Sequence, residues 1–198
     1  MISVLFVGLG AHLRGGLTVW QRATATTERL QRQRVAFDRL ERDLANAIVY
    51  DDRPSSYGEL NGQLPTPQFG AATLGVYTVS TATTQPSPAI RLVTYTCERI
   101  DGTPGFWRTS QLVGEARERS QQSAPELMLP GCEALSLRYA YRPTGTTEQG
   151  GLEWKARWLD RPDEALRLPR LIEATVQVSG RSVRRICAIP IGLLGVSE

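Results

Sequence analysis

The feature that most constrains the fold of this chain is a long segment without proline or glycine, from Leu17 to Tyr50. Because both residues disrupt helices, their absence over this length is typical of one continuous helix. Apolar side chains recur within the segment at helical spacing and form a single stripe. The predicted core-facing residues of the stripe are Phe37, Leu40, Leu44 and Ile48, and it also includes Leu30 and Ala47. The pattern therefore predicts a helix that lies with one face on a core.

The N-terminal segment from Met1 to Leu13 is an apolar run that contains two glycines. A membrane-spanning helix needs about 20 mostly apolar residues, so the run is too short to span by itself. No basic segment precedes it and no A-x-A-like site follows it, which argues against a conventional signal peptide. We interpret the run as the end of a membrane helix or the start of a buried one. If the helix also includes this run, it has about 45 residues, whereas helices in globular proteins ordinarily have about 8 to 20.

A segment with proline and glycine, Asp51 to Gly58, ends the helical pattern, and strand-like segments follow it. The predicted strands are Leu74–Ser80, Ile90–Cys97, Phe106–Val113, Ala134–Tyr141, Leu152–Leu159, Leu171–Val178 and Val183–Ile189. Alternation in the fifth of them places Trp154 and Trp158 on one face. Ser179-Gly180-Arg181 is a good hairpin turn between the last two. These elements predict an α+β fold in which one long helix, residues 1–50, packs on an antiparallel β domain, residues 51–198.

The charge of the chain does not favour a nucleic-acid interface. The formal net charge is +3, and the basic residues are almost all arginines. They are spread from Arg14 to Arg185 with acidic residues between them, whereas nucleic-acid binders usually concentrate their basic residues on one face. We therefore expect no nucleic-acid partner.

No motif of catalysis or cofactor binding outweighs a structural interpretation. Gly8 and Gly10 suggest a dinucleotide-binding turn, but Leu13 stands where the third glycine should be, and no βαβ pattern follows. His12 is the single histidine of the chain, which excludes a multi-histidine metal site, and no carboxylate near it in sequence could orient it for catalysis. We expect no catalytic residue, metal, cofactor or small-molecule substrate.

The three cysteines, Cys97, Cys132 and Cys187, are too widely spaced for a CxxC metal or redox motif. Cys97 and Cys187 lie in predicted strands, where small buried thiols are common. A Cys97–Cys132 disulfide would be possible if their strands were neighbours. The interpretation that the sequence favours is three packed or unpaired thiols.

Four segments follow one another in a recognisable order. They are Leu30–Val49 (LQRQRVAFDRLERDLANAIV), Glu126–Tyr141 (ELMLPGCEALSLRYAY), Trp154–Trp158 with an acidic turn after it, and Leu168–Ile172 leading into a strand and a final Ile189-Pro190. Each is weakly specific alone, but their order and spacing resemble the J-type minor pseudopilins of bacterial type II secretion. The resemblance extends from about Leu9 to Pro190.

This resemblance implies a pilin-like fold and a structural rather than a catalytic function. Members of the family are thought to cap a short pseudopilus together with I- and K-type pseudopilins, which are therefore the expected partners in a hetero-oligomer. Leu17, Trp20 and Leu30 are the expected partner-interface residues, because they precede the part of the helix that can rest on a sheet. The resemblance also implies the bacterial inner membrane as the location, with the N-terminal helix in it and the globular domain in the periplasm.

Family members begin, after a short basic leader, with a cleavage-site glycine, a phenylalanine and a glutamate at the fifth mature position. None of these is present here, so Met1 is expected to lie partway through the apolar helix. Two other classes stay open. One is a minor pilin of a type IV pilus, which is built on the same plan. The other is a periplasmic enzyme or ligand-binding protein, which would require a cleft lined by titratable groups.

Overall fold

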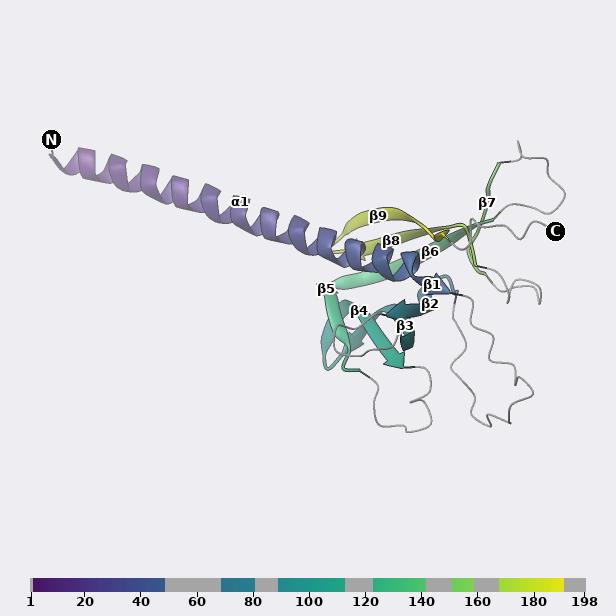
Figure 1. Ribbon diagram of the computed structural model, residues 1–198. Coiled ribbons are helices and arrows are strands. Elements are labelled where there is room, and N and C mark those ends of the chain that lie inside the picture. Colours follow the sequence, from purple (N-terminus) through teal and green to yellow (C-terminus); the bar gives the residue numbers. More distant parts are fainter. Residues whose placement is uncertain are drawn as a thin grey trace, which may run out of the picture.

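The computed structural model describes residues 2–48, 69–80, 89–112, 123–141, 151–158 and 168–190, with side chains from residue 15 onward. Its elements are α1 (Ile2–Ala45), β1 (Ala47–Ile48), β2 (Thr73–Ser80), β3 (Ala89–Ile100), β4 (Thr103–Leu112), β5 (Glu126–Pro130), β6 (Cys132–Tyr141), β7 (Glu153–Lys155), β8 (Leu171–Val178) and β9 (Arg181–Ala188). One long helix precedes antiparallel strands (Figure 1), which confirms the predicted α+β class.

The strands divide between two antiparallel sheets. The first sheet has the order β1-β2-β3-β4-β5 and the second has the order β7-β6-β8-β9. The chain passes from the first sheet to the second between β5 and β6, at Gly131. Gly131 has a φ of 72°, a left-handed conformation that glycine adopts without steric cost. The abrupt change of sheet therefore depends on a glycine at this position.

The helix ends at Ala45, so the prediction that it continues to Tyr50 is wrong. Asn46 caps the last turn of the helix. Its backbone N–H and its side-chain amide both donate hydrogen bonds to the carbonyl oxygen of Arg42, at 3.2 and 2.8 Å. Those bonds occupy a carbonyl group that the end of a helix otherwise leaves without a partner. Asparagine is a common residue at such ends, because its short side chain reaches the backbone.

Ile48 was predicted as a core-facing helix residue, but it lies in β1. Ala47 and Ile48 pair with Thr78 and Tyr77 of β2, at the edge of the first sheet. The β-branched side chain of Ile48 suits a strand better than another helical turn. The apolar stripe of the sequence thus continues from the helix into the sheet, with a change of backbone conformation that periodicity does not reveal.

The predicted strand Leu152–Leu159 is shorter in the structure, where β7 covers only Glu153–Lys155. Trp154 lies opposite Ala140 of β6 and is half-buried, whereas Trp158 follows the strand and is buried in the core. The two tryptophans therefore do not share a strand face as predicted. Strands β1 and β5 were not predicted, because both are short and neither alternates clearly.

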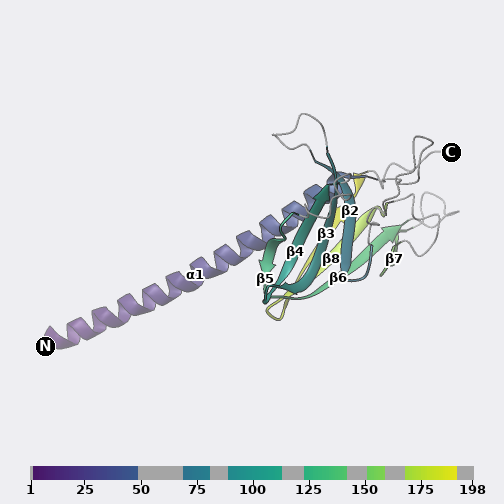
Figure 2. The same ribbon diagram turned by 90° about the horizontal axis from the view of Figure 1, so that it is seen from below.

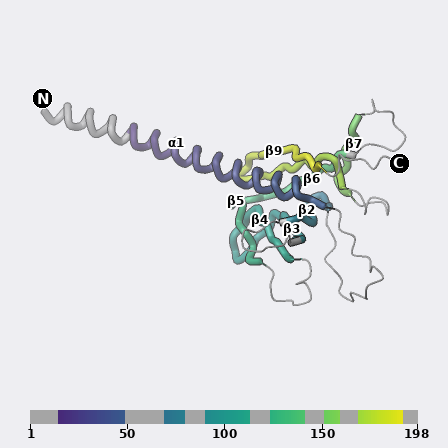
Figure 3. Tube along the Cα trace, viewed as in Figure 1, coloured from purple at the N-terminus to yellow at the C-terminus, as the bar shows by residue number. Residues whose placement is uncertain are grey.

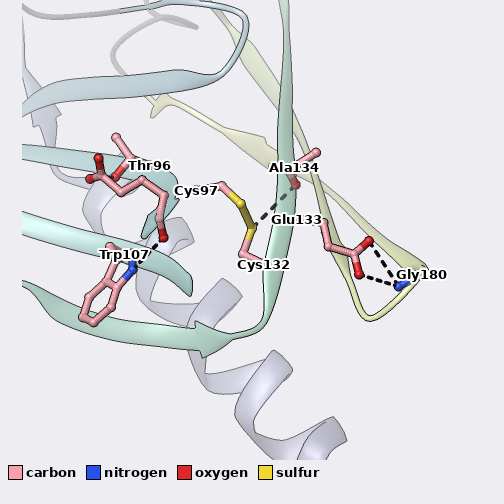
Figure 4. The surroundings of a disulfide bond; sticks show 8 residues. Thr96, Cys97, Trp107, Cys132, Glu133, Ala134 and Gly180 are labelled. Carbon is pink, nitrogen blue, oxygen red and sulfur yellow. Dashed lines mark hydrogen bonds between the residues drawn. A yellow bond between two sulfur atoms is a disulfide. The ribbon is translucent and has the colours of Figure 1, made fainter. Parts of the chain in front are cut away.

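The hairpin between β8 and β9 agrees with the sequence. Ser179 and Gly180 both have positive φ, 50° and 69°, which is the geometry of a two-residue hairpin turn. The Glu133 carboxylate accepts a hydrogen bond from the backbone N–H of Gly180 at 3.0 Å (Figure 4). The start of β6 therefore supports the turn.

One continuous core lies between the helix and the two sheets. Helix α1 packs against β2 and β5 of the first sheet and β9 of the second, and β6 packs against β2, β3 and β4. The largest fully buried apolar and aromatic side chains are Phe37, Leu40, Leu44, Leu74, Val76, Val93, Tyr95, Phe106, Leu137, Tyr139, Ile172 and Ile189. Because these come from the helix and both sheets, neither sheet has a separate core.

A disulfide bond joins Cys97 of β3 to Cys132 of β6, so the interpretation of three packed or unpaired thiols is wrong (Figure 4). The two Cα atoms are 5.8 Å apart, within the ordinary range for a disulfide. The cysteines meet only because the two sheets pack together, which the strand pattern alone does not show. We call this bond the inter-sheet disulfide.

Removing the inter-sheet disulfide should lower the free energy of unfolding by about 2–4 kcal/mol. The bond joins cysteines 35 positions apart and so restricts the unfolded chain. Denaturant unfolding of the Cys97→Ala/Cys132→Ala variant measures the effect.

The matched control is Cys187→Ala, which removes a buried free thiol and leaves the disulfide in place. A reductant should destabilise the parent chain and Cys187→Ala, and should leave the double variant unchanged. The same response to reductant in all three proteins would contradict the role of the bond.

Candidate functional site

The helix extends beyond the sheets with a run of uncovered apolar side chains. We call residues 15–35 the exposed helix segment, because none of its side chains is buried. Its large apolar residues are between 56% and 67% exposed, and they are Leu17, Val19, Trp20, Leu30 and Val35. Both ribbon views show this part of α1 projecting from the sheets (Figures 1 and 2), and the coloured part of the tube shows the same (Figure 3).

The apolar residues of the exposed helix segment lie on two faces of the helix. Successive residues turn by about 100°, so Leu30 continues the row of Phe37 that packs on the sheets. Leu17 and Val35 are separated by about five full turns and share the opposite face. Trp20 lies between these two directions. The three predicted interface residues therefore do not form a single patch.

Threonines whose hydroxyls are already hydrogen-bonded within the helix lie between the large apolar residues. Thr24, Thr26 and Thr27 donate hydrogen bonds from their hydroxyls to the carbonyl oxygens four residues earlier, at 3.0, 2.8 and 3.0 Å. A threonine bonded in this way needs no further partner when it is covered. Another helix could therefore approach this part of α1 closely without leaving a hydroxyl unsatisfied.

The last turns of α1 attach the exposed helix segment to the sheets. Phe37, Leu40 and Leu44 are at most 1% exposed and belong to the core. Burying a large apolar side chain stabilises a fold by about 1.5–3 kcal/mol. We call these three residues, together with Asp43, the helix anchor.

A buried ionic cluster ties the helix anchor to the first sheet. Asp43 Oδ2 accepts hydrogen bonds from the Tyr95 hydroxyl at 2.6 Å and from Arg108 Nε at 2.7 Å. Asp43 and Arg108 are each 8% exposed, and Tyr95 is fully buried. Arg108 Nη1 also lies 3.5 Å from Glu126. Charge-assisted hydrogen bonds are strong and directional in such surroundings, so the cluster fixes how the helix is rotated on the sheet.

Tyr95 and Arg108 keep their protonation states over the physiological pH range. Burial raises the pKa of the Tyr95 hydroxyl far above its ordinary value, and the Asp43 carboxylate raises it further, so Tyr95 stays a neutral donor. Burial by itself lowers the pKa of Arg108, but the hydrogen bond and the attraction to Asp43 outweigh it and raise that pKa. Both hydrogen-bond donors to Asp43 are therefore present at physiological pH.

The cysteines do not form a nucleophilic site. Cys97 and Cys132 share the inter-sheet disulfide. Burial raises the pKa of the Cys187 thiol to about 12, with a further rise from the Glu41 carboxylate and an opposing effect of Arg185. Cys187 is therefore a protonated, unreactive thiol at neutral pH. The side chain of His12 lies outside the described residues.

Among the described residues, no group of three or more histidine, cysteine, aspartate or glutamate side chains is arranged to hold a metal ion. In the same part of the chain, no helix has both the length and the apolar character of a membrane span. What these residues do form is a firmly attached helix with an uncovered apolar surface, which suits association with other proteins.

Sequence reasoning did not single out the ionic cluster, although one signal was present. Asp43 precedes Leu44 and follows Leu40 by three positions, which places it at the edge of the apolar stripe. Acidic residues are rarely buried unless they are paired, so an aspartate there predicts a buried basic partner. The sequence does not reveal which of its many arginines is that partner, because the choice depends on how the sheets fold.

Comparison with known families gives a match over most of the chain. The family model described as type II secretion system (T2SS), protein J, matches residues 11–189. The matched range includes the exposed helix segment, the helix anchor and every strand of both sheets. No curated protein and no solved structure matches the chain.

Replacing Asp43 with asparagine should lower the free energy of unfolding by about 3–5 kcal/mol, because it removes the buried counter-charge of Arg108 and leaves only the exposed Glu126 carboxylate at 3.5 Å. Thermal or denaturant unfolding measures the change. Asp38→Asn is the matched control on the same helix, since Asp38 forms an exposed ion pair with Arg34 at 3.7 Å. The control should change stability by less than about 1 kcal/mol. Equal effects of the two substitutions would contradict the structural role of the cluster.

Proposed function

This chain belongs to the type II secretion system protein J family, the J-type minor pseudopilins, and we propose that it assembles at the tip of the secretion pseudopilus. In this proposal it is a structural subunit rather than an enzyme. It packs the exposed helix segment against the helices of I- and K-type pseudopilins and so supports protein export.

The observation that carries this proposal is the uncovered apolar surface on a helix that is firmly attached at its other end. Leu17, Trp20 and Leu30 are exposed to solvent in the isolated chain. A lone helix in water gains little stability from its own hydrogen bonds, because most helical stability in proteins comes from packing. Partner helices would supply that packing and remove the apolar side chains from water.

The two apolar faces of the segment suit two partners. Val19 and Leu30 lie on the side that continues toward the sheets, and Leu17 and Val35 lie on the opposite side. A helix with apolar residues on both sides can contact two neighbouring helices at the same time. The threonines between them allow close approach on either side. This arrangement supports a hetero-oligomer with both an I-type and a K-type subunit.

The inter-sheet disulfide supports a periplasmic location for the sheets. Disulfides persist in oxidising compartments such as the bacterial periplasm and are rare in the cytosol. Cys97 and Cys132 hold the two sheets together in such surroundings. The disulfide therefore supports the proposal of a periplasmic globular domain, and in this proposal the N-terminal part of α1 is directed to the inner membrane.

Changing Trp20 to glutamate tests the helix interface. The substitution should weaken co-purification with I- and K-type pseudopilins by about tenfold or more, because it removes a large aromatic contact and would bury a charge in an apolar seam. The thermal stability of the isolated chain should not change, because Trp20 is 66% exposed.

Ala25→Glu is the matched control, because it adds the same charge on the same helix in a sector that carries arginines rather than large apolar residues. This variant should bind the partners as the parent chain does. Parent-like binding by Trp20→Glu, or equal weakening by both variants, would refute the proposed interface.

A further inference from the structure

The outer face of the second sheet carries a row of interacting side chains that the core and the helix do not use. Arg138 of β6 lies directly opposite Glu173 of β8, and Glu173 lies directly opposite Ile186 of β9. Two positions before Ile186, and therefore on the same face, is Arg184. Trp154 of β7 lies beside Ala140 of β6, which is two positions from Arg138. The row therefore crosses the whole sheet.

The glutamate in this row is covered by the two arginines. The Glu173 side chain is only 8% exposed, although it points away from the core. Arg138 Nη1 lies 3.7 Å from one of its carboxylate oxygens, and Arg184 Nη2 contacts the other. The Arg138 and Arg184 side chains are 51% and 60% exposed. The row thus presents its guanidinium groups to solvent and hides its carboxylate.

The positions of the guanidinium groups are fixed in advance. Glu173 holds both, and the Arg138 guanidinium also stacks over the Trp154 ring at 5.5 Å from the ring centre. Arginines that are already ordered lose less side-chain entropy when a ligand binds. These two side chains are therefore better prepared for binding than freely moving surface arginines.

The charges of the row do not cancel. Two guanidinium groups share one carboxylate, so the row carries one net positive charge. Exposed apolar surface flanks this charge, with Ile186 at 49% exposure on one side and the half-buried Trp154 on the other.

We propose that this face, the row of Trp154, Arg138, Glu173, Arg184 and Ile186, is a second docking surface that binds an extended, acidic segment of a partner protein. Arginine forks bind carboxylates through paired hydrogen bonds. In an extended segment, side chains at positions i and i+2 lie about 7 Å apart on one side, which suits two guanidinium groups that share a single glutamate. The apolar portions of the segment contact Trp154 and Ile186.

This surface is separate from the exposed helix segment. The inner face of the second sheet packs on the core beside α1, so its outer face points away from the helix. A protein bound there would not compete with helices packed on α1. The chain could therefore hold its assembly partners and a further protein at the same time.

The test uses the full chain and an octapeptide that alternates glutamate with serine, with both ends blocked. Titration is followed by NMR through the indole N–H signal of Trp154, which the Trp154→Phe variant identifies. We expect a saturable shift of this signal. The corresponding peptide of alternating glutamine and serine should cause none.

The decisive variant is Arg138→Gln/Glu173→Gln/Arg184→Gln, which removes the charges of the row without leaving a buried carboxylate unpaired. It should bind the acidic peptide about tenfold more weakly or worse. The control Arg181→Gln changes the net charge of the chain by the same amount, at the hairpin end of β9, and should bind as the parent does. The variant Arg138→Lys/Arg184→Lys keeps a counter-charge for Glu173 and should weaken binding about threefold, since lysine lacks the planar fork.

Four results would overturn the proposal. They are no shift with the acidic peptide, parent-like binding by the triple variant, equal weakening by Arg181→Gln, and binding to phosphatidylglycerol vesicles without binding to the peptide. The last would identify the face as a membrane surface instead. Loss of the helix partners through Trp20→Glu should leave peptide binding unchanged, so this test is independent of the helix interface.

Discussion

The geometry of the molecule depends on a single buried contact between Asp43 of the helix and the Tyr95–Arg108 pair of the first sheet. Apolar packing by Phe37, Leu40 and Leu44 attracts the helix to the sheets, but such packing is not directional and would tolerate small rotations. The aspartate removes that freedom, because both of its hydrogen bonds must be made within a buried site. The direction in which the rest of α1 leaves the sheets is therefore set at one residue.

The two sheets are joined to this contact in different ways. The first sheet provides Tyr95 and Arg108 directly, and the main contact of the second sheet with α1 is through β9. The inter-sheet disulfide between Cys97 and Cys132 compensates for that difference, since it ties the second sheet to β3, the strand that carries Tyr95. Helix, first sheet and second sheet thus form one unit with a common core.

Much of the fold followed from local patterns. The absence of proline and glycine predicted the long helix, and the strands with clear alternation or flanking turns were found close to their observed positions. The errors occurred where tertiary contacts decided the outcome. Ile48 left the helix because β2 offered a pairing edge, and Cys97 met Cys132 because two sheets packed together.

The candidate site was predictable to a smaller extent. Leu17, Trp20 and Leu30 were expected to be exposed because they precede the part of the helix that rests on the sheets, and all three are exposed. The partners of a buried charge and the neighbours of a surface charge are not encoded locally. Arg108 and Arg138 look alike in the sequence, yet one is enclosed beneath the helix and the other stacks on Trp154 in solvent.

An unbroken helix that is attached at one end also behaves mechanically as a lever. From Ala36 to Gly15 the exposed helix segment extends about 30 Å, so a tilt of about 5° at the helix anchor moves Gly15 by about 3 Å, close to the width of an atom. A rigid helix anchor therefore fixes the position of the exposed helix segment, which lies far from the sheets.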